Sequence, residues 1–288
     1  MPLQNVPKSP ENSTFGALLH VPRSSTIYTT RAKFIPQRGG GLRLAQIQSF
    51  SVPKFRPSGW DDEETESALL AADEASERSS GDADTAANIQ RASRRAKTRA
   101  LDAILCNPDL DTFATFTFAP DPDLDKSAYD QTYDILKPWL SNRVQRNDLK
   151  YIVVPELHKS GDVHFHGVMN SQALKLEQAF YPDSGRAILH NGKKVFNVID
   201  WRAGFTTAQI IGRSDTDRDK VAKYVFKYMG KQLGARIGGR YALMGGALER
   251  PVYYYSNNPA YFFNGNSPVY QRDVEIGSDL TYREWSFV

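Results

Sequence analysis

The chain has 288 residues, 40% hydrophobic and 24% charged, which is typical of globular proteins and excludes collagen-like and disulfide-stapled classes. No run approaches the ~18 apolar residues of a transmembrane helix, and residues 1–30 lack a signal-peptide pattern, so we expect a cytoplasmic protein without a membrane partner. The single cysteine, Cys106, excludes an intramolecular disulfide and any cysteine-rich metal site.

The net charge of +3 is an average over unlike segments. Residues 61–84 hold ten acids and one arginine, so the rest of the chain carries 35 basic against 23 acidic residues, a net charge of +12. This excess favours an anionic partner, and nucleic acid is the commonest one.

The first 87 residues show little periodicity. Residues 1–60 are rich in Pro, Ser, Thr and Gly, and we predict an irregular N-terminal arm with one short strand near Leu44–Val52. Residues 61–87 form an acidic linker that contains no aromatic residue and cannot bury enough apolar surface to fold alone.

A basic helix is predicted over residues 88–105, where apolar residues recur at helical spacing until Asn107-Pro108 stops them. Five basic residues crowd its other face without one acid: Arg91, Arg94, Arg95, Lys97 and Arg99. This face is either a DNA-binding surface that contacts phosphates or a solvated charged face.

From residue 112 onward the pattern predicts an α+β domain with an antiparallel sheet, which we bound at residues 88–235. The expected strands are 112–119, 151–156, 162–169, 194–200 and 204–211, and the expected helices are 127–147, 171–180 and 217–233. Residues 236–288 form a C-terminal extension without a clear domain of its own, which we expect to pack against the sheet or contact DNA.

Two histidines, His164 and His166, occupy alternate positions of one predicted strand, so both imidazoles point to one face while Val163, Phe165 and Val168 are assigned to the core. Glu156 ends the preceding strand across a hairpin-length loop and is a third metal ligand, with His158 in reserve. This set suits Mg²⁺ or Mn²⁺, and ligand type also allows Zn²⁺, Co²⁺ or Fe²⁺.

Other interpretations of the histidine pair remain open at this point. Two histidines on a strand face are often plain polar surface, and two histidines with one carboxylate also occur in non-haem iron enzymes. A cupin-like site would need a glutamate soon after the pair, and the sequence there is GVMNSQA.

The segment KVAKYVFKYMGK (220–231) carries the nucleophile hypothesis. On a helix, Tyr224 and Tyr228 lie one turn apart, and each is followed three residues later by a lysine, Lys227 and Lys231. The pair could be a packing pair, but a tyrosine can also attack a phosphodiester if a metal and a nearby lysine stabilise the charge. Two further lysines of this helix are predicted to bind DNA: Lys220 and Lys223.

Three ordered motifs resemble those of the HUH endonucleases, specifically the rolling-circle replication initiators of small single-stranded DNA phages, viruses and plasmids. These motifs are FATFTF (113–118), HFH (164–166) and YVFKYMGK (224–231). The basic helix and GGALERP (245–251) are weaker points of resemblance, which covers residues 88–251 and leaves residues 1–87 outside.

The resemblance implies a ferredoxin-like or RRM-like core with a five-stranded antiparallel sheet and the tyrosine helix lying across its active face. It implies that a tyrosine nicks single-stranded origin DNA, keeps the 5′ phosphate and frees a 3′-OH for a host polymerase in the cytoplasm of a bacterial host. No GxxxxGK[ST] motif occurs, so unwinding is expected to come from a host helicase. A transposase or relaxase with the same chemistry, or a non-cleaving origin-binding protein, are the alternatives, and the order of tyrosine attack is open.

Overall fold

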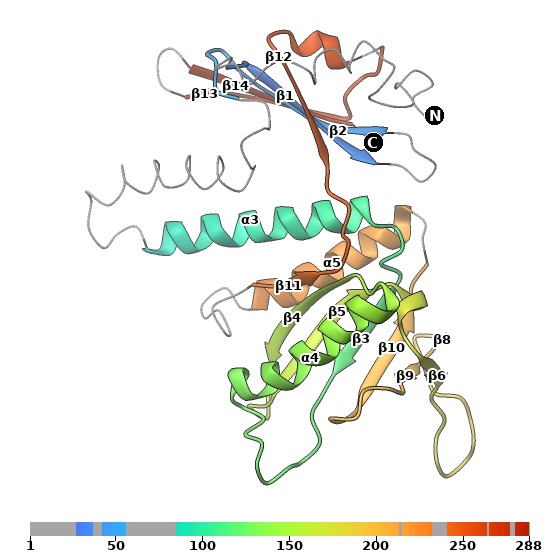
Figure 1. Cartoon of the computed structure of the whole chain (residues 1–288). Coiled ribbons are helices and arrows are strands. Elements are labelled where there is room, and N and C mark those ends of the chain that lie inside the picture. The colour runs from blue at the N-terminus through green and yellow to red at the C-terminus, as the bar shows by residue number, and fades with distance from the viewer. Residues whose placement is uncertain are drawn as a thin grey trace. The chain divides into compact units, whose positions relative to one another are not determined.

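The computed structural model (Figure 1) describes residues 27–36, 42–55, 85–212, 215–231, 241–263, 265–276 and 280–287. The chain forms two compact units, one made of residues 85–249 and the other of residues 1–84 together with 250–288. Among the described residues no helix is long and apolar enough to cross a membrane.

The first unit is built on an antiparallel sheet of seven strands in the order β11-β4-β5-β3-β10-β9-β6. The central strands are β3 (Thr112–Phe116), β4 (Tyr151–Leu157), β5 (Val163–Met169) and β10 (Thr206–Ile210), and the outer ones are β6 (Leu176–Gln178), β9 (Phe196–Val198) and β11 (Leu243–Gly245). A separate hairpin pairs β7 (Leu189–His190) with β8 (Lys193–Lys194). The unit is α+β, as predicted.

One face of this sheet packs on helix α4 (Tyr129–Asn147), drawn in green in Figure 1. Leu136 and Leu140 of α4 are buried against Phe116 and Phe165 of the sheet. The sequence places Tyr129, Tyr133, Leu136, Leu140 and Val144 on one side of this helix, and all five belong to this core. The amphipathic pattern therefore predicted the packing face of α4 correctly.

The opposite face packs on helices α3 (Thr85–Cys106) and α5 (Asp215–Lys231). Val221, Val225 and Met229 of α5 are fully buried against the sheet, as the helical spacing predicts. Val168 is buried in a core as predicted, but it belongs to this second core rather than to the one that holds Val163 and Phe165. The reason is strand alternation, because residues 164, 166 and 168 share one face.

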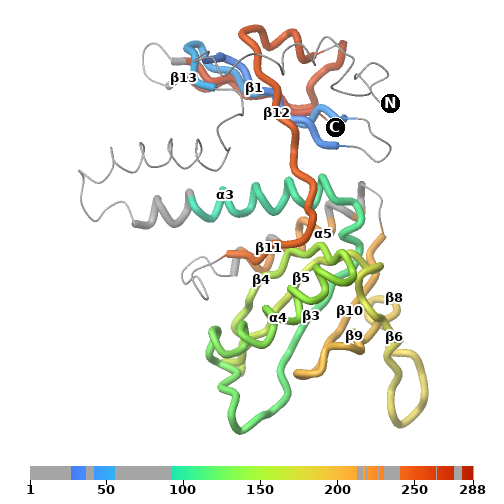
Figure 2. Tube along the Cα trace, viewed as in Figure 1, coloured from blue at the N-terminus to red at the C-terminus, as the bar shows by residue number. Residues whose placement is uncertain are grey.

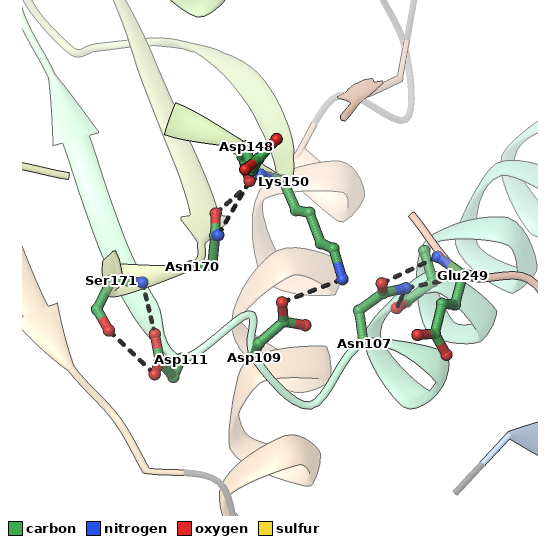
Figure 3. A network of polar contacts seen from close by, with 9 residues as sticks. Asn107, Asp109, Asp111, Asp148, Lys150, Asn170, Ser171 and Glu249 are labelled. Carbon is green, nitrogen blue, oxygen red and sulfur yellow. Dashed lines mark hydrogen bonds and ion pairs between the residues drawn. The ribbon is translucent and has the colours of Figure 1, made fainter. Parts of the chain in front are cut away.

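A network of polar contacts ties the ends of these elements together (Figure 3). The Asn170 side chain accepts a hydrogen bond from the Lys150 backbone and donates one to the Asp148 carbonyl, and Asp111 accepts two from Ser171. Asn107 donates to two backbone carbonyls, one of them of Glu249, and accepts from the Glu249 backbone. These buried amides and carboxylates satisfy backbone groups where strands and helices end.

The second unit is a five-stranded antiparallel sheet in the order β12-β1-β2-β14-β13. Its strands are β1 (Thr30–Pro36), β2 (Leu42–Phe50), β12 (Val252–Ser256), β13 (Tyr270–Ile276) and β14 (Leu280–Ser286). A short 3-10 helix (Pro259–Phe262) contributes Phe262 to the core on one side of it. Figure 2 shows the N-terminal strands, in blue, lying beside the C-terminal ones, in red.

Several predictions of local structure differ from these elements. Residues 30–36 and 42–50 are strands, so the irregular arm is wrong there, whereas the short strand expected near Leu44–Val52 is confirmed as β2. Within the expected C-terminal extension, β12 pairs with β1, β14 pairs with β2, and β13 pairs with β14. The expected helix over 171–180 is a single 3-10 turn (Ser171–Ala173) followed by β6, because Leu174 and Leu176 turn into the core beneath α4. The sheet has seven strands rather than five. The acidic linker lies almost entirely outside the described residues.

Candidate functional site

Two histidines of β5 project from the sheet face that packs on α5. Val163 and Phe165 point to the opposite core, so alternation directs His164 and His166 away from it. His166 is buried, with 8% of its surface exposed, and His164 is half-buried. Gly167 follows directly, and a Cβ there would lie 2.7 Å from the Ile152 carbonyl oxygen, so only glycine fits between the strands.

Both nitrogens of the His166 ring lie close to a side-chain oxygen from a neighbouring strand. Strand β4 pairs with β5 so that Glu156 lies opposite His164, and its Oε2 is 2.7 Å from His166 Nε2. Strand β3 pairs Thr115 with His166, and the Thr115 hydroxyl is 3.0 Å from Nδ1. The imidazole is therefore held in one orientation by a carboxylate and a hydroxyl.

The tyrosines of α5 lie directly on this group. The Tyr228 ring stacks on the His166 imidazole with 4.1 Å between centroids and 11° between planes. The Tyr224 ring packs against Phe113 of β3, with centroids 3.7 Å apart. The two tyrosine hydroxyls are 3.2 Å apart and share a hydrogen bond. Both side chains are partly buried, at the edge of the apolar arc where the helical spacing predicts them.

Burial changes the acidity of two of these groups. It lowers the pKa of His164, and the neighbouring His158 acts in the same direction, so this imidazole stays neutral and keeps its lone pair at neutral pH. Burial raises the pKa of the Tyr224 phenol, and Tyr228 adds to the effect, while a hydrogen bond from Thr115 opposes it. The two tyrosines thus differ in environment although their sequence contexts are nearly alike.

The donor set has the chemistry of a divalent metal site. It joins one carboxylate, from Glu156, to the imidazoles of His164 and His166. Within the described part of the chain, no three His, Cys, Asp or Glu side chains are arranged to hold a metal ion, and Glu156 and His166 instead contact each other directly. Glu156 and His166 are therefore adjacent side chains, and the His166 and His164 rings have centroids 6.2 Å apart.

The reserve ligand, His158, lies beside His164. The His158 and His164 rings stack with 4.7 Å between centroids, and the His158 Nδ1 is 3.0 Å from the Ser160 hydroxyl. The reserve histidine is therefore close to the predicted metal ligands, but its loop position leaves it exposed.

The predicted basic residues divide into those near the tyrosines and those elsewhere. Lys227 Nζ lies 5.8 Å from the centre of the Tyr228 ring, and Lys223 is exposed on the same helix. Lys220 is ion-paired with Asp217 at 3.2 Å. The side chains of Lys231 and Arg91 lie outside the described residues. On α3, whose Ala100 and Ile104 pack in the same core as α5, two arginines are exposed and two basic residues are half-buried: Arg94, Arg99, Arg95 and Lys97.

Two residues of the site, Thr115 and Phe113, were not singled out from the sequence. Both belong to β3 and face α5; Thr115 contacts His166 and Tyr224, and Phe113 contacts Tyr224. Alternation within TFATF carried the signal, since positions 113 and 115 share a face, but only strand pairing shows which residues lie opposite them.

Comparison with known proteins adds one finding. Residues 111–233 match the family model described as replication-associated protein ORF2/G2P. The match begins just before β3 and ends just after α5, so it contains the histidines, Glu156 and both tyrosines. A search of curated proteins and a search of solved structures gave no significant match. The family match indicates a role in replication.

Proposed function

We propose that this protein is an HUH-type rolling-circle replication initiator that nicks and rejoins single-stranded origin DNA through a 5′-phosphotyrosine. The observation that carries the proposal is the stacking of Tyr228 on His166, whose imidazole is held by Glu156 and Thr115. Helix α5 thereby holds a tyrosine, the proposed nucleophile, directly beside a proposed metal ligand, inside the segment that matches a replication-associated family.

The reaction is a transesterification that conserves the number of phosphodiester bonds. A tyrosine oxygen attacks the phosphorus, the bond from phosphorus to the 3′ oxygen breaks, the phenol loses its proton and the departing 3′ oxygen gains one. The 5′ phosphate stays on the tyrosine, and a 3′-OH is released for a host polymerase. Attack by a 3′-OH on the phosphotyrosine reverses the step, so rejoining needs no ATP.

His164 and His166, with Glu156, would hold a Mg²⁺ or Mn²⁺ ion, which supplies polarisation of the scissile phosphate when bound. The low pKa of His164 keeps that imidazole available as a ligand at neutral pH. Lys227 is exposed next to Tyr228 and would favour the phenolate and attract the phosphate. The exposed arginines of α3 and Lys223 would contact the DNA backbone.

The two tyrosines are not equivalent, and Tyr228 is the better first nucleophile. Its ring contacts His166, whereas Tyr224 contacts Phe113. Burial raises the pKa of Tyr224 and so disfavours its phenolate. The hydroxyls are 3.2 Å apart, so Tyr224 lies within reach of the same phosphate region for a second cut while Tyr228 holds the first end.

The test uses the full chain, Mn²⁺ or Mg²⁺, and single-stranded oligonucleotides tiling the replicon that encodes it. Denaturing gels should show a metal-dependent covalent adduct with one oligonucleotide, reduced more by Tyr228→Phe than by Tyr224→Phe and absent in the double variant. An undiminished adduct in the double variant contradicts the mechanism. Tight binding of one oligonucleotide without any adduct would instead identify a non-cleaving origin-binding protein.

A further inference from the structure

The second unit, whose described strands lie outside the segment that matches a known family, carries a surface of its own. One side of its sheet is the hydrophobic core formed by Ala32, Phe34, Ile47 and Trp285. Strand alternation directs the intervening residues to the other side. Register places Arg31 between Tyr255 and Gln48, and Lys33 between Tyr253 and Gln46.

This other side is rich in aromatic rings and cations. We call it the aromatic–basic face; its members are Tyr28, Arg31, Lys33, Gln46, Gln48, Phe50, Lys54, Phe55, Tyr253, Tyr255, Arg272, Tyr282 and Glu284. Most of these side chains are half-buried, and Lys54 and Arg272 are exposed. A sheet face turned away from a core normally carries small polar residues, so the concentration of rings here requires an explanation.

The rings and cations are already arranged in contact with one another. The Arg31 guanidinium lies 5.0 Å from the centre of the Phe55 ring and 5.1 Å from that of Tyr253, and it donates a hydrogen bond to Gln48. The Lys54 ammonium lies 4.4 Å from the Phe50 ring. These contacts fix the cations without neutralising them, because neither rings nor amides carry negative charge.

The acid on the face is engaged from two sides. Glu284 accepts a hydrogen bond from the Tyr282 hydroxyl at 2.6 Å and another from Gln46. Among the described residues of this face, the cations Arg31, Lys54 and Arg272 outnumber the one carboxylate, Glu284. The summed charge of these described residues is positive and complements a polyanion.

We propose that the aromatic–basic face binds single-stranded DNA, as a second site separate from the nicking site. Cations that track phosphates and aromatic rings on which bases stack are the combination that single-strand-binding proteins use. A duplex hides the faces of its bases in its own stack and cannot use the rings, so the surface favours single strands. Rolling-circle replication displaces such a strand, so the assignment extends the proposed function without depending on the nicking chemistry.

Fluorescence anisotropy of the full chain with a 20-nucleotide oligo-dT tests the assignment. Tyr255→Ala should weaken binding about 5- to 100-fold while leaving binding of a 20-base-pair duplex nearly unchanged. The double variant Arg31→Gln/Lys33→Gln should lower the salt slope of log K by about 1.4, and the surface variant Lys54→Gln by about 0.7. Arg283→Gln is the matched control, since Arg283 is exposed on the opposite face of β14.

The contradicting results are equally specific. Unchanged oligo-dT affinity and salt slope in all three variants, with melting temperatures showing that they are folded, would overturn the assignment. Equal losses on oligo-dT and duplex in Tyr255→Ala would also overturn it. Failure of the nicking proposal would show as absence of the covalent adduct in the wild-type protein. The variants of the aromatic–basic face test the second site separately, because they should keep a wild-type adduct yield at saturating DNA.

Discussion

Replacing Thr115 by valine tests whether the Thr115 hydroxyl positions the His166 ring. Valine keeps the shape of threonine and removes the hydroxyl that lies 3.0 Å from His166 Nδ1. A threonine hydroxyl can donate or accept, so it serves His166 whether the ring proton is on Nδ1 or on Nε2, and valine serves neither. Because His166 is only 8% exposed, water cannot readily replace the lost partner.

The expected loss of metal affinity follows from what it costs to remove a hydrogen-bond partner of a metal-binding side chain. Loss of a hydrogen bond to a buried group costs about 1–3 kcal/mol, and loss of an outer partner of a metal ligand weakens metal binding about 10- to 100-fold. Titration of the full chain with Mn²⁺ by calorimetry should therefore show a Kd for Thr115→Val raised by that factor. The adduct yield should recover largely at saturating Mn²⁺, because the nucleophile and the ligands remain.

The control is Thr117→Val, two residues along the chain. The Thr117 hydroxyl donates to the Phe205 carbonyl at 3.0 Å and does not contact a histidine. Its loss should leave the Mn²⁺ affinity within about two-fold of wild type, as expected for an exposed hydrogen bond. Wild-type Mn²⁺ affinity in Thr115→Val would refute the assignment of Thr115 as a positioning residue.

Three further substitutions test the fold around the site. Asn107→Ala removes three hydrogen bonds of a buried amide and should lower the free energy of unfolding in urea by about 2–4 kcal/mol; a change below about 0.5 kcal/mol would contradict the role of this network. Gly167→Ala puts a methyl group 2.7 Å from a backbone oxygen of β4 and should lower the free energy of unfolding, measured by thermal melts, by about 1–3 kcal/mol. A wild-type melting temperature would mean that β4 and β5 can move apart to accept the methyl group without cost. The Lys126 ammonium lies 3.2 Å from Asp162 and lowers the pKa of that carboxyl, and Lys126→Met removes it. NMR titration should show this pKa rising toward its ordinary value, and the variant should lose less stability on acidification through that range, because a depressed carboxyl pKa stabilises the fold only above it.

The sequence predicted those parts of the fold that depend on local periodicity. The spacing of Val221, Val225 and Met229 identified the buried arc of α5, and the alternation around His164 and His166 identified their common face. The short loop between β4 and β5 was enough to expect Glu156 beside the histidines. Each of these inferences uses residues that are near one another in the chain.

The second unit could not be predicted in the same way because its pairing is non-local. β1 with β2 and β13 with β14 are local hairpins, but Thr30 of β1 also pairs with Ser256 of β12, and Trp285 of β14 pairs with Ile47 of β2, so the sheet closes only through segments far apart in the sequence. A strand such as TRAKFIP alternates, but alternation alone does not show which distant segment completes the sheet. The aromatic–basic face combines strands from both ends of the chain, so no single segment of the sequence predicts it.

Mass spectrometry of the covalent adduct identifies the nucleophile of the proposed nicking reaction. The adduct formed with the reactive oligonucleotide and Mn²⁺ is digested with nuclease and protease, and the residual nucleotide is located by fragmentation. We expect a nucleotide phosphate on Tyr228 in wild type and on Tyr224 when Tyr228 is replaced by phenylalanine. A nucleotide attached outside α5, or a metal-dependent nick without any attached nucleotide, would contradict it.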